Sequence, residues 1–126
     1  IAARGEYAGF VSYIATKFWA GGLCYPYRSI KEDVILTKFI YYYLKNIEQS
    51  IMNVLVARGS IPAINKSDVD KIQIPIPSLP IQQEIVSILD KFTELEAELE
   101  AELEARKKQY EYYRNKLLTF KNRADT

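Results

Sequence analysis

IPIPSLPIQQEIVSILDKFTELEAELEAELEARKKQ, residues 74–109, contains the boundary that decides the fold. The prolines at its start favour an extended chain, whereas Ser78 can cap a helix and Pro80 is tolerated in a first turn. From there to about Lys121 no glycine or proline interrupts the sequence. The pattern therefore predicts a single helix of roughly 40 residues, about 60 Å long at ~1.5 Å per residue.

This helix carries an apolar seam, which we define as the positions that recur at spacings of three and four residues, as in coiled coils. Between Leu99 and Leu103 the spacing is four where three is expected, and such a stutter locally unwinds a supercoil. A ~60 Å helix exceeds the ~30 Å diameter of a module of this size, so we expect the seam to contact another long helix. The seam consists of Ile81, Ile85, Ile88, Phe92, Leu95, Leu99, Leu103, Arg106, Tyr110, Tyr113, Leu117 and Phe120.

The tetrapeptide ELEA occurs three times in succession at residues 94–105. Two interpretations of the repeat stay open, a solvated acidic helix face and a spacer whose length matters. The basic residues Arg106, Lys107 and Lys108 follow the repeat directly. An antiparallel neighbour would place this acidic block near a basic block, so the residues favour antiparallel helix association.

The part of the chain before the prolines predicts a small α+β module. FVSYIAT (10–16), LCYPY (23–27) and KIQIP (71–75) are typical of short strands because polar and apolar residues alternate or aromatic residues dominate. Apolar residues at helical spacing predict an amphipathic helix over residues 34–49, packed on the sheet. The segment 57–71 predicts a loop with one helical turn that begins at Ser67.

The predicted architecture is thus an α+β fold in two parts. Residues 1–77 form a partial domain with a small β-sheet and a helix. Residues 78–126 form a long coiled-coil-forming helix. Because the first residue is Ile rather than Met, we expect a fragment of a longer protein.

Composition limits the function classes. The chain has no histidine and one cysteine, Cys24, so zinc frameworks and histidine acid–base chemistry are excluded and we expect a reducing, cytoplasmic setting. No apolar run approaches ~18 residues, so we expect no membrane span. Asp68 and Asp70 begin a helical turn and favour its dipole rather than catalysis. We expect no metal site and no enzymatic activity.

The block GSIPAINKSDVDKIQIPIPSLPIQQEIVSILD, residues 59–90, resembles the specificity subunits of type I restriction–modification systems, where the end of a target recognition domain leads into a long helix. The departures are Pro80 and Ile81, which stand where the family often has Glu. AARGEYAGFVSY and FIYYYLK also resemble family segments. The residues that match the family pattern in the block are Gly59, Ser60, Pro62, Asn65, Lys66, Ile74, Pro75, Pro77, Leu79, Gln82, Ile85 and Val86.

The resemblance implies a non-catalytic subunit that reads one half of a bipartite double-stranded DNA target. It implies that the long helix acts as a spacer and docks the modification (methyltransferase) subunits, and that restriction subunits join the complex. S-adenosylmethionine and ATP would be bound by these partner subunits. This chain would bind no cofactor. Family members with half the usual content can pair as two-fold dimers, so we expect an antiparallel homodimer through the long helix. Two alternatives stay open: a coiled-coil dimerisation or scaffold protein with a structural head, and a small regulator that pairs through the same helix.

Candidate DNA-binding residues are basic, amide, hydroxyl or aromatic side chains in the recognition module. Arginine can bind guanine and asparagine adenine with two hydrogen bonds each. The two Arg-Gly turns, at Arg4 and Arg58, are favoured because glycine lets the backbone approach DNA closely. The candidates are Arg4, Tyr7, Tyr13, Lys17, Tyr25, Arg58, Ser60, Asn65 and Lys66. The candidates for the helix interface are Ile85, Ile88, Phe92, Leu95, Leu99, Leu103, Tyr110, Tyr113 and Leu117.

Overall fold

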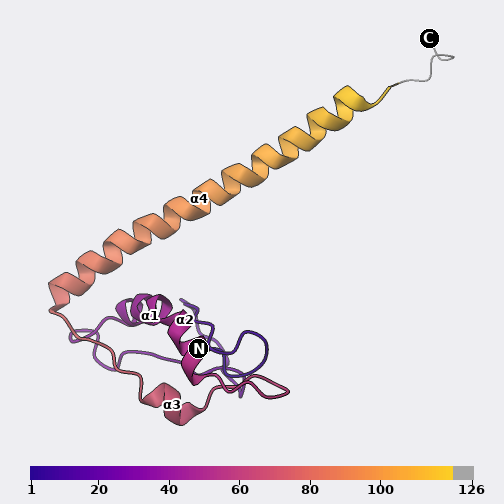
Figure 1. Ribbon diagram of the computed structural model, residues 1–126. Helices are drawn as coiled ribbons and strands as arrows, with labels where there is room; N and C mark the ends of the chain where they lie inside the picture. The colour runs from indigo at the N-terminus through magenta and orange to yellow at the C-terminus, as the bar shows by residue number, and fades with distance from the viewer. Residues whose placement is uncertain (121–126) are drawn as a thin grey trace. The chain divides into compact units, whose positions relative to one another are not determined.

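The computed structural model describes residues 1–120. Residues 121–126, the end of the predicted second part, lie outside the described residues. Packing divides the chain into two units, Ile1–Ile88 and a second unit that begins at Leu89. The helical elements in chain order are α1 (Thr37–Asn46), α2 (Glu48–Ser50), the π-helical η1 (Ile51–Leu55), α3 (Lys66–Asp70) and α4 (Leu79–Leu118) (Figure 1).

The predicted long helix is confirmed as α4, which has 40 residues. The backbone N–H of Gln82 donates to the Ser78 carbonyl at 3.1 Å, which starts the helix where the sequence indicates. The helix continues because it is rich in Glu, Leu, Ala, Lys and Arg, all strong helix formers, and contains no breaker beyond its first turn. Within residues 1–120, no helix is both long and apolar enough to cross a membrane.

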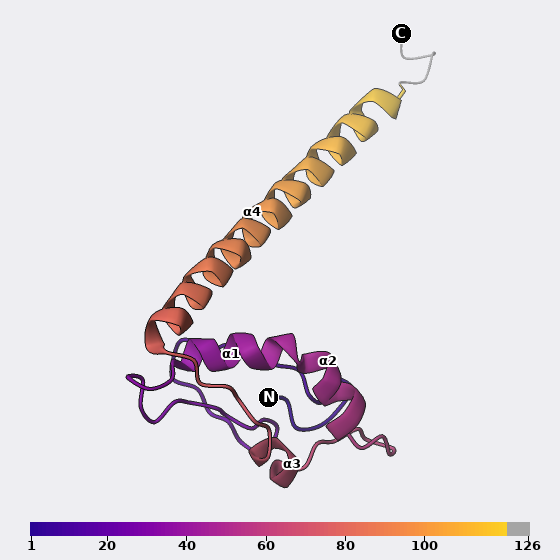
Figure 2. The ribbon, with the colours of Figure 1, turned by 60° about the vertical axis from the view of Figure 1, so that its left-hand side comes forward.

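The core of the first unit is formed by buried side chains of α1, η1, α3 and the non-helical segments, and Figure 2 shows the backbone of these parts of the chain. Ile40 and Leu44 on one face of α1 pack with Val11, Ile51 and other buried side chains in one cluster. The predicted amphipathic helix is therefore confirmed, although it begins at Thr37 instead of residue 34. The predicted turn near Ser67 is confirmed as α3, which begins one residue earlier.

The predicted β-sheet is wrong: residues 1–120 contain no strand longer than an isolated residue pair. Single antiparallel pairs join Ala2 to Cys24, Arg4 to Ala63 and Ala57 to Ala63. Proline explains in part why these pairs do not extend into a ladder. Pro26 follows Cys24 by two residues and Pro62 directly precedes Ala63, and neither has an N–H to donate.

Side chains from helices bind the backbone of Val11, near the start of the first predicted strand. The N–H of Val11 donates to the Glu48 carboxylate at 2.7 Å, and the Val11 carbonyl accepts from Lys45 Nζ at 3.0 Å. A neighbouring strand would normally supply these two partners. The segment that begins at Val11 is therefore held against α1 and α2 and not in a sheet.

Gln82 joins the first turn of α4 to the segment before α1. Its side chain is fully buried, with 0% exposure. The amide oxygen accepts from the Leu36 N–H at 2.9 Å, while Nε2 donates to the carbonyls of Val34 and Pro77 at 2.9 and 2.8 Å. Gln82 occupies the Val34 carbonyl and the Leu36 N–H, so neither group joins a helix. Val34 lies in a turn whose N–H donates to the Lys31 carbonyl at 3.0 Å, Leu36 is extended, and α1 starts after them.

Candidate nucleic-acid interface

Two exposed loops that the sequence singled out lie side by side in the structure. The Ala57 and Ala63 backbones exchange hydrogen bonds of 2.7 and 3.1 Å, which closes a hairpin loop over residues 58–62. The Gly5 N–H donates to the Pro62 carbonyl at 2.8 Å, and Arg4 pairs with Ala63. Arg4 and Arg58 are both exposed, so the fold presents them on neighbouring loops.

Glycine shapes the first of these loops, residues 4–9 (the Arg4 loop), and not the second, the 58–62 hairpin. Gly5 and Gly9 have φ angles of 92° and 91°, which favour glycine, and the Ala8 N–H closes a turn on the Gly5 carbonyl at 3.0 Å. Gly59 has an ordinary φ, and an added Cβ there would meet no atom within 4 Å. The Arg-Gly argument therefore holds for the conformation at Arg4, whereas at Arg58 glycine only leaves open space.

Three further candidates continue from the hairpin loop. Ser60 lies at its tip and is exposed. Asn65 precedes α3, and its backbone carbonyl accepts the N–H groups of Asp68 and Val69 at 3.1 Å each. Lys66 is the first residue of α3 and is exposed. The Ile64 N–H donates to the Ala3 carbonyl at 2.9 Å, so this segment stays beside the Arg4 loop.

The four remaining candidates differ in their surroundings. Tyr7 is 67% exposed in the Arg4 loop. Tyr25 is half-buried, and its hydroxyl donates to the Ile64 carbonyl at 2.9 Å, which gives it a structural role. Tyr13 packs on Tyr41 of α1 with ring centroids 5.6 Å apart. Lys17 is exposed on the same segment as Tyr13, so these two do not belong to the paired loops.

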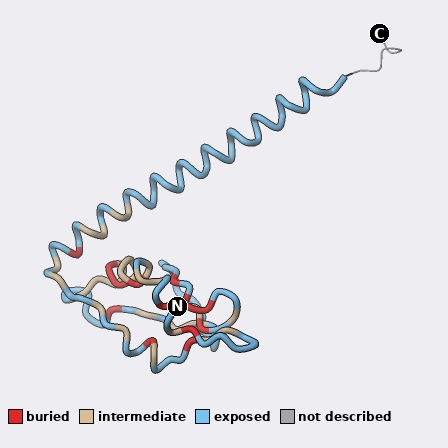
Figure 3. Tube along the Cα trace, in the orientation of Figure 1, coloured by how far each residue is buried: buried red, intermediate tan, exposed pale blue. Residues whose placement is uncertain are grey.

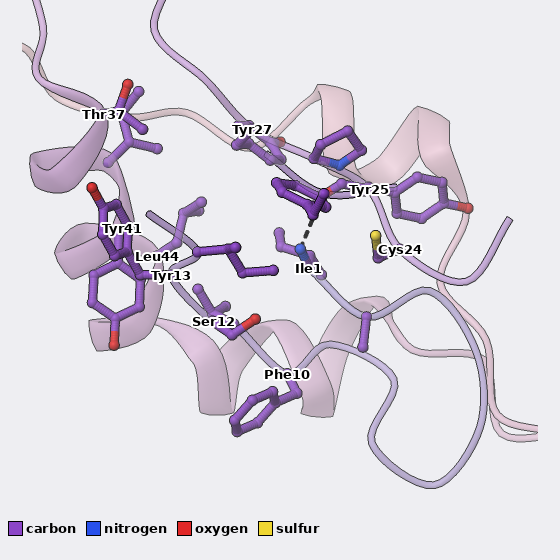
Figure 4. A pocket seen from close by; sticks show the side chains of 16 residues that line it. Ile1, Phe10, Ser12, Tyr13, Cys24, Tyr25, Tyr27, Thr37, Tyr41 and Leu44 are labelled. Carbon is purple, nitrogen blue, oxygen red and sulfur yellow. Dashed lines mark hydrogen bonds between the residues drawn. The ribbon is translucent and has the colours of Figure 1, made fainter. Parts of the chain in front are cut away.

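A cavity of about 180 Å³ lies between α1 and the extended segments (Figure 4). Aromatic and aliphatic side chains form most of its wall, including Phe10, Tyr13, Tyr25 and Tyr41. Burial, and secondarily the charge of Asp70, raise the pKa of the nearby Tyr27, whose hydroxyl donates to the Val69 carbonyl. None of the residues on the Arg4 loop or the 58–62 hairpin lines this cavity.

The sequence did not single out the polar side chains that hold the module together. Lys45 and Glu48 form an ion pair of 2.8 Å, and Lys45 Nζ also lies 4.1 Å from the Phe10 ring centroid. Their spacing of three residues on a helical pattern is a signal that could have found this pair. Gln82 was noted only as part of a motif, although it makes three side-chain hydrogen bonds.

The seam of α4 is exposed over most of its length. Every residue from Lys91 to Phe120 is exposed, as Figure 3 shows along the helix. Of the predicted interface residues, Ile85 is half-buried, whereas Phe92, Leu99, Tyr110 and Leu117 are 64%, 56%, 67% and 71% exposed. The remaining members, Ile88, Leu95, Leu103 and Tyr113, are each about half exposed, at 47%, 49%, 55% and 49%. Their pairing with a second helix stays a prediction.

A family model described as "Type I restriction modification DNA specificity domain" matches residues 1–105. The chain belongs to this family. The match spans the Arg4 loop, the 58–62 hairpin and α4 as far as the end of the ELEA repeat. The resemblance drawn from residues 59–90 is thereby confirmed.

Curated proteins named as type I specificity subunits, some of them with the word "putative" in the name, are similar to this chain. An Escherichia coli protein named "Type I restriction enzyme EcoR124I/EcoR124II specificity subunit" is 45% identical over 100 residues, which cover 74% of this chain and 24% of that protein. A Mycoplasma pneumoniae protein named as a type I specificity subunit is 40% identical over 131 residues, with 94% and 38% covered. A Haemophilus influenzae relative is 38% identical over 118 residues, with 86% and 29% covered.

The specificity domain described here thus spans between about a quarter and two fifths of the length of these relatives. No solved structure shows a significant match. The relatives support the family and the DNA-recognition class of the chain. The ligands and partner subunits of the whole protein are proposed below.

Proposed function

We propose that this chain reads one half of a bipartite double-stranded DNA target within a type I restriction–modification complex. The paired Arg4 and 58–62 loops are the proposed reading surface, since Arg4, Arg58 and Lys66 are exposed cations on connected segments. The observation that carries the proposal is the family match over residues 1–105, which includes both loops.

The chain itself is proposed to be non-catalytic. Methyl transfer and cleavage would be performed by modification and restriction subunits, which would bind S-adenosylmethionine and ATP. The long helix α4 would dock the modification subunits and pair antiparallel with α4 of a second copy. The exposed seam supports this role, because so many half-exposed apolar side chains on one helix are typical of an interaction surface.

Substitution of the two arginines tests the reading surface. Arg4→Ala and Arg58→Ala are compared with Arg28→Ala, which removes an exposed arginine outside both loops. DNA binding by the chain assembled with its modification subunits is measured as a function of salt. Loss of a phosphate contact lowers the slope of log K against log salt by about 0.9, and loss of a base contact costs about 1–3 kcal/mol and relaxes specificity. Equal behaviour of all three variants would contradict the assignment.

The ELEA repeat is proposed to act as a ruler between half-sites. One repeat lengthens a helix by about 6 Å and rotates the rest of the helix beyond it by about 40°. Two base pairs occupy ~7 Å along DNA. Removal of one ELEA should therefore shorten the gap between methylated half-sites by one or two base pairs without altering the half-sites, as sequencing of methylated sites would detect. Unchanged spacing would refute the ruler.

A coiled-coil scaffold is the second candidate function, and the exposed seam favours it equally. A scaffold needs no cationic reading loops. Salt-dependent DNA binding that is lost in the loop variants supports recognition. Dimerisation without any DNA binding, by the chain in complex with its modification subunits, supports the scaffold.

A further inference from the structure

The order of spacings along the seam is symmetric within α4. Eleven of its members, from Ile81 to Leu117, lie inside the helix Leu79–Leu118. Their successive spacings are 4, 3, 4, 3, 4, 4, 3, 4, 3 and 4 residues. This series reads the same in both directions, and Leu99 stands at its centre. A seam of this kind is complementary to itself when the second helix runs in the opposite direction.

We infer that two copies of α4 pair antiparallel about a two-fold axis at Leu99, a statement that rests on the pairing proposed above. In this alignment Leu99 meets Leu99 of the second copy, Leu95 meets Leu103, and Ile88 meets Tyr110. At the ends, Ile81 meets Leu117. Every seam position inside the helix therefore faces another seam position, which is the condition for knobs-into-holes packing along the full length.

Arg106, the single charged member of the seam, supports the antiparallel direction. In a parallel pair, two Arg106 guanidinium groups would face each other. About the Leu99 axis, Arg106 instead meets Phe92 of the second copy, and a guanidinium over an aromatic face is attractive. Arg106 also lies 3.5 Å from Glu102 on its own helix, so its charge has a nearby partner in either case.

The alignment that best matches charge is a competing arrangement, and it covers less of the seam. Placing the acidic residues 94–104 opposite the basic segment 106–116 moves the axis to residue 105. Residues 79–91 of each helix then have no counterpart within α4, which leaves Ile81, Ile85 and Ile88 uncovered. Many remaining seam residues face a position one residue away from the seam. Exposed ion pairs contribute little, whereas each covered apolar layer contributes in proportion to its area.

The area supports a stable pair about Leu99. Most seam side chains are between 47% and 71% exposed. Covering them on two copies removes on the order of 1,500 Å² from water, near the ~1,600 Å² of a standard protein interface. The same alignment also places like charges beside the seam, with Glu96 near Glu102 and Lys91 near Lys107 of the second copy. Such repulsion between exposed charges is weak and is screened by salt.

The repeat can change its length without destroying this symmetry. If one ELEA is removed, the spacings become 4, 3, 4, 3, 4, 3, 4, 3 and 4, which is again symmetric. If one is added, a further spacing of four enters at the centre and symmetry is kept. The ruler therefore lies on the axis, where a change lengthens both halves of the pair equally.

Spin labels measure the alignment directly in the 126-residue chain. The label is placed at Asn115→Cys, an exposed position off the seam, in a Cys24→Ser background. When two helices pair about Leu99, residue 115 of one helix lies opposite residue 83 of the other. The two labels are then 32 residues apart along the helices, or about 48 Å. The charge-matched alignment gives about 30 Å, and a parallel pair about 10 Å, close to the distance between packed helices. Circular dichroism of the labelled chain confirms that the helix is intact.

A distance near 48 Å that falls to about 42 Å when one ELEA is removed would support the inference. A distance near 30 Å would overturn the Leu99 axis but leave the proposed antiparallel pair standing. A distance near 10 Å, or a monomer at all concentrations, would overturn both. DNA recognition is judged separately by the loop variants.

The salt dependence of the dimer dissociation constant is an independent test, because the two alignments predict changes in opposite directions. About the Leu99 axis, screening of like charges should tighten the dimer roughly threefold or more between 50 and 500 mM NaCl. Pairing by charge would weaken the dimer over the same range. Sedimentation equilibrium measures the dissociation constant in both conditions, and a weaker dimer at high salt would refute the alignment.

Discussion

The Gln82 side chain offers a sharp test of how the module is held together. Gln82→Ala removes one hydrogen bond accepted from Leu36 and two donated to Val34 and Pro77. A net hydrogen bond contributes about 0.5–1.5 kcal/mol, and a buried group left without a partner costs about 1–3 kcal/mol. Val34 is 46% exposed, so water can replace part of the loss at its carbonyl. We expect the free energy of unfolding to fall by about 2–4 kcal/mol.

The neighbouring Gln83→Ala is the matched control, because Gln83 is exposed in the same helical turn. Its effect should stay within about 0.5 kcal/mol. Urea unfolding at a single protein concentration, followed by tyrosine fluorescence, measures both variants. A difference between them below about 0.5 kcal/mol would refute the reasoning.

A second substitution at this position removes only the two hydrogen bonds that Gln82 Nε2 donates. Gln82→Glu keeps an acceptor for the Leu36 N–H but places a carboxylate against two carbonyls. Burial raises the pKa of such a carboxyl group, so the variant should regain stability as the pH falls and the group is protonated. A variant whose stability relative to wild type does not improve at low pH would show that the site is open to water.

Three more substitutions test separate contacts. Gly9→Ala should cost about 1–3 kcal/mol, because φ is positive and a Cβ would lie 3.0 Å from Met52 Cγ, whereas Gly59→Ala in open space should change little in the same thermal melts. The raised pKa of Tyr27 means that its contribution is complete below about pH 10 and is lost as the pH rises further. Tyr27→Phe should therefore be less stable near neutrality but lose stability less steeply above pH 10, and parallel alkaline curves for the two proteins would contradict this. Glu48→Gln should lower stability by about 1 kcal/mol in urea, since it weakens the bonds to Lys45 and Val11, and no change would show that charge is unimportant there.

The long helix could be predicted because its evidence is local. Helix formers, the absence of breakers after Pro80 and the seam spacing all point to the same element. The same holds for α1, whose apolar face is visible at helical spacing. Its start could not be predicted, because the groups that keep Val34 and Leu36 out of the helix come from Gln82, 46 and more residues away.

The sheet was predicted from alternating polar and apolar residues and from aromatic residues, a pattern that indicates only that a segment favours an extended, half-buried position. Tertiary contacts decide which groups pair with the backbone N–H and C=O groups of such a segment. At Val11 they are filled by Glu48 and Lys45, which no alternating pattern reveals.

The candidate site was partly visible in the sequence. Arg4 and Arg58 were chosen for their Arg-Gly turns, and the structure brings their loops together through Gly5, Pro62 and Ala63. The engaged hydroxyl of Tyr25 could not be foreseen, since its acceptor lies 39 residues away. Which residues touch DNA stays a prediction for every candidate.

The exposed length of α4 has a consequence for abundance. Every residue of the helix from Lys91 to Leu118 is exposed. A helix without tertiary contacts owes its stability in large part to whatever covers its apolar face. The melting temperature of the chain should therefore rise with its concentration, because association of folded chains shifts the unfolding equilibrium toward the folded state. Because the proposed partner is a second copy of the chain, the folded fraction in a cell would then rise with the amount of the chain itself.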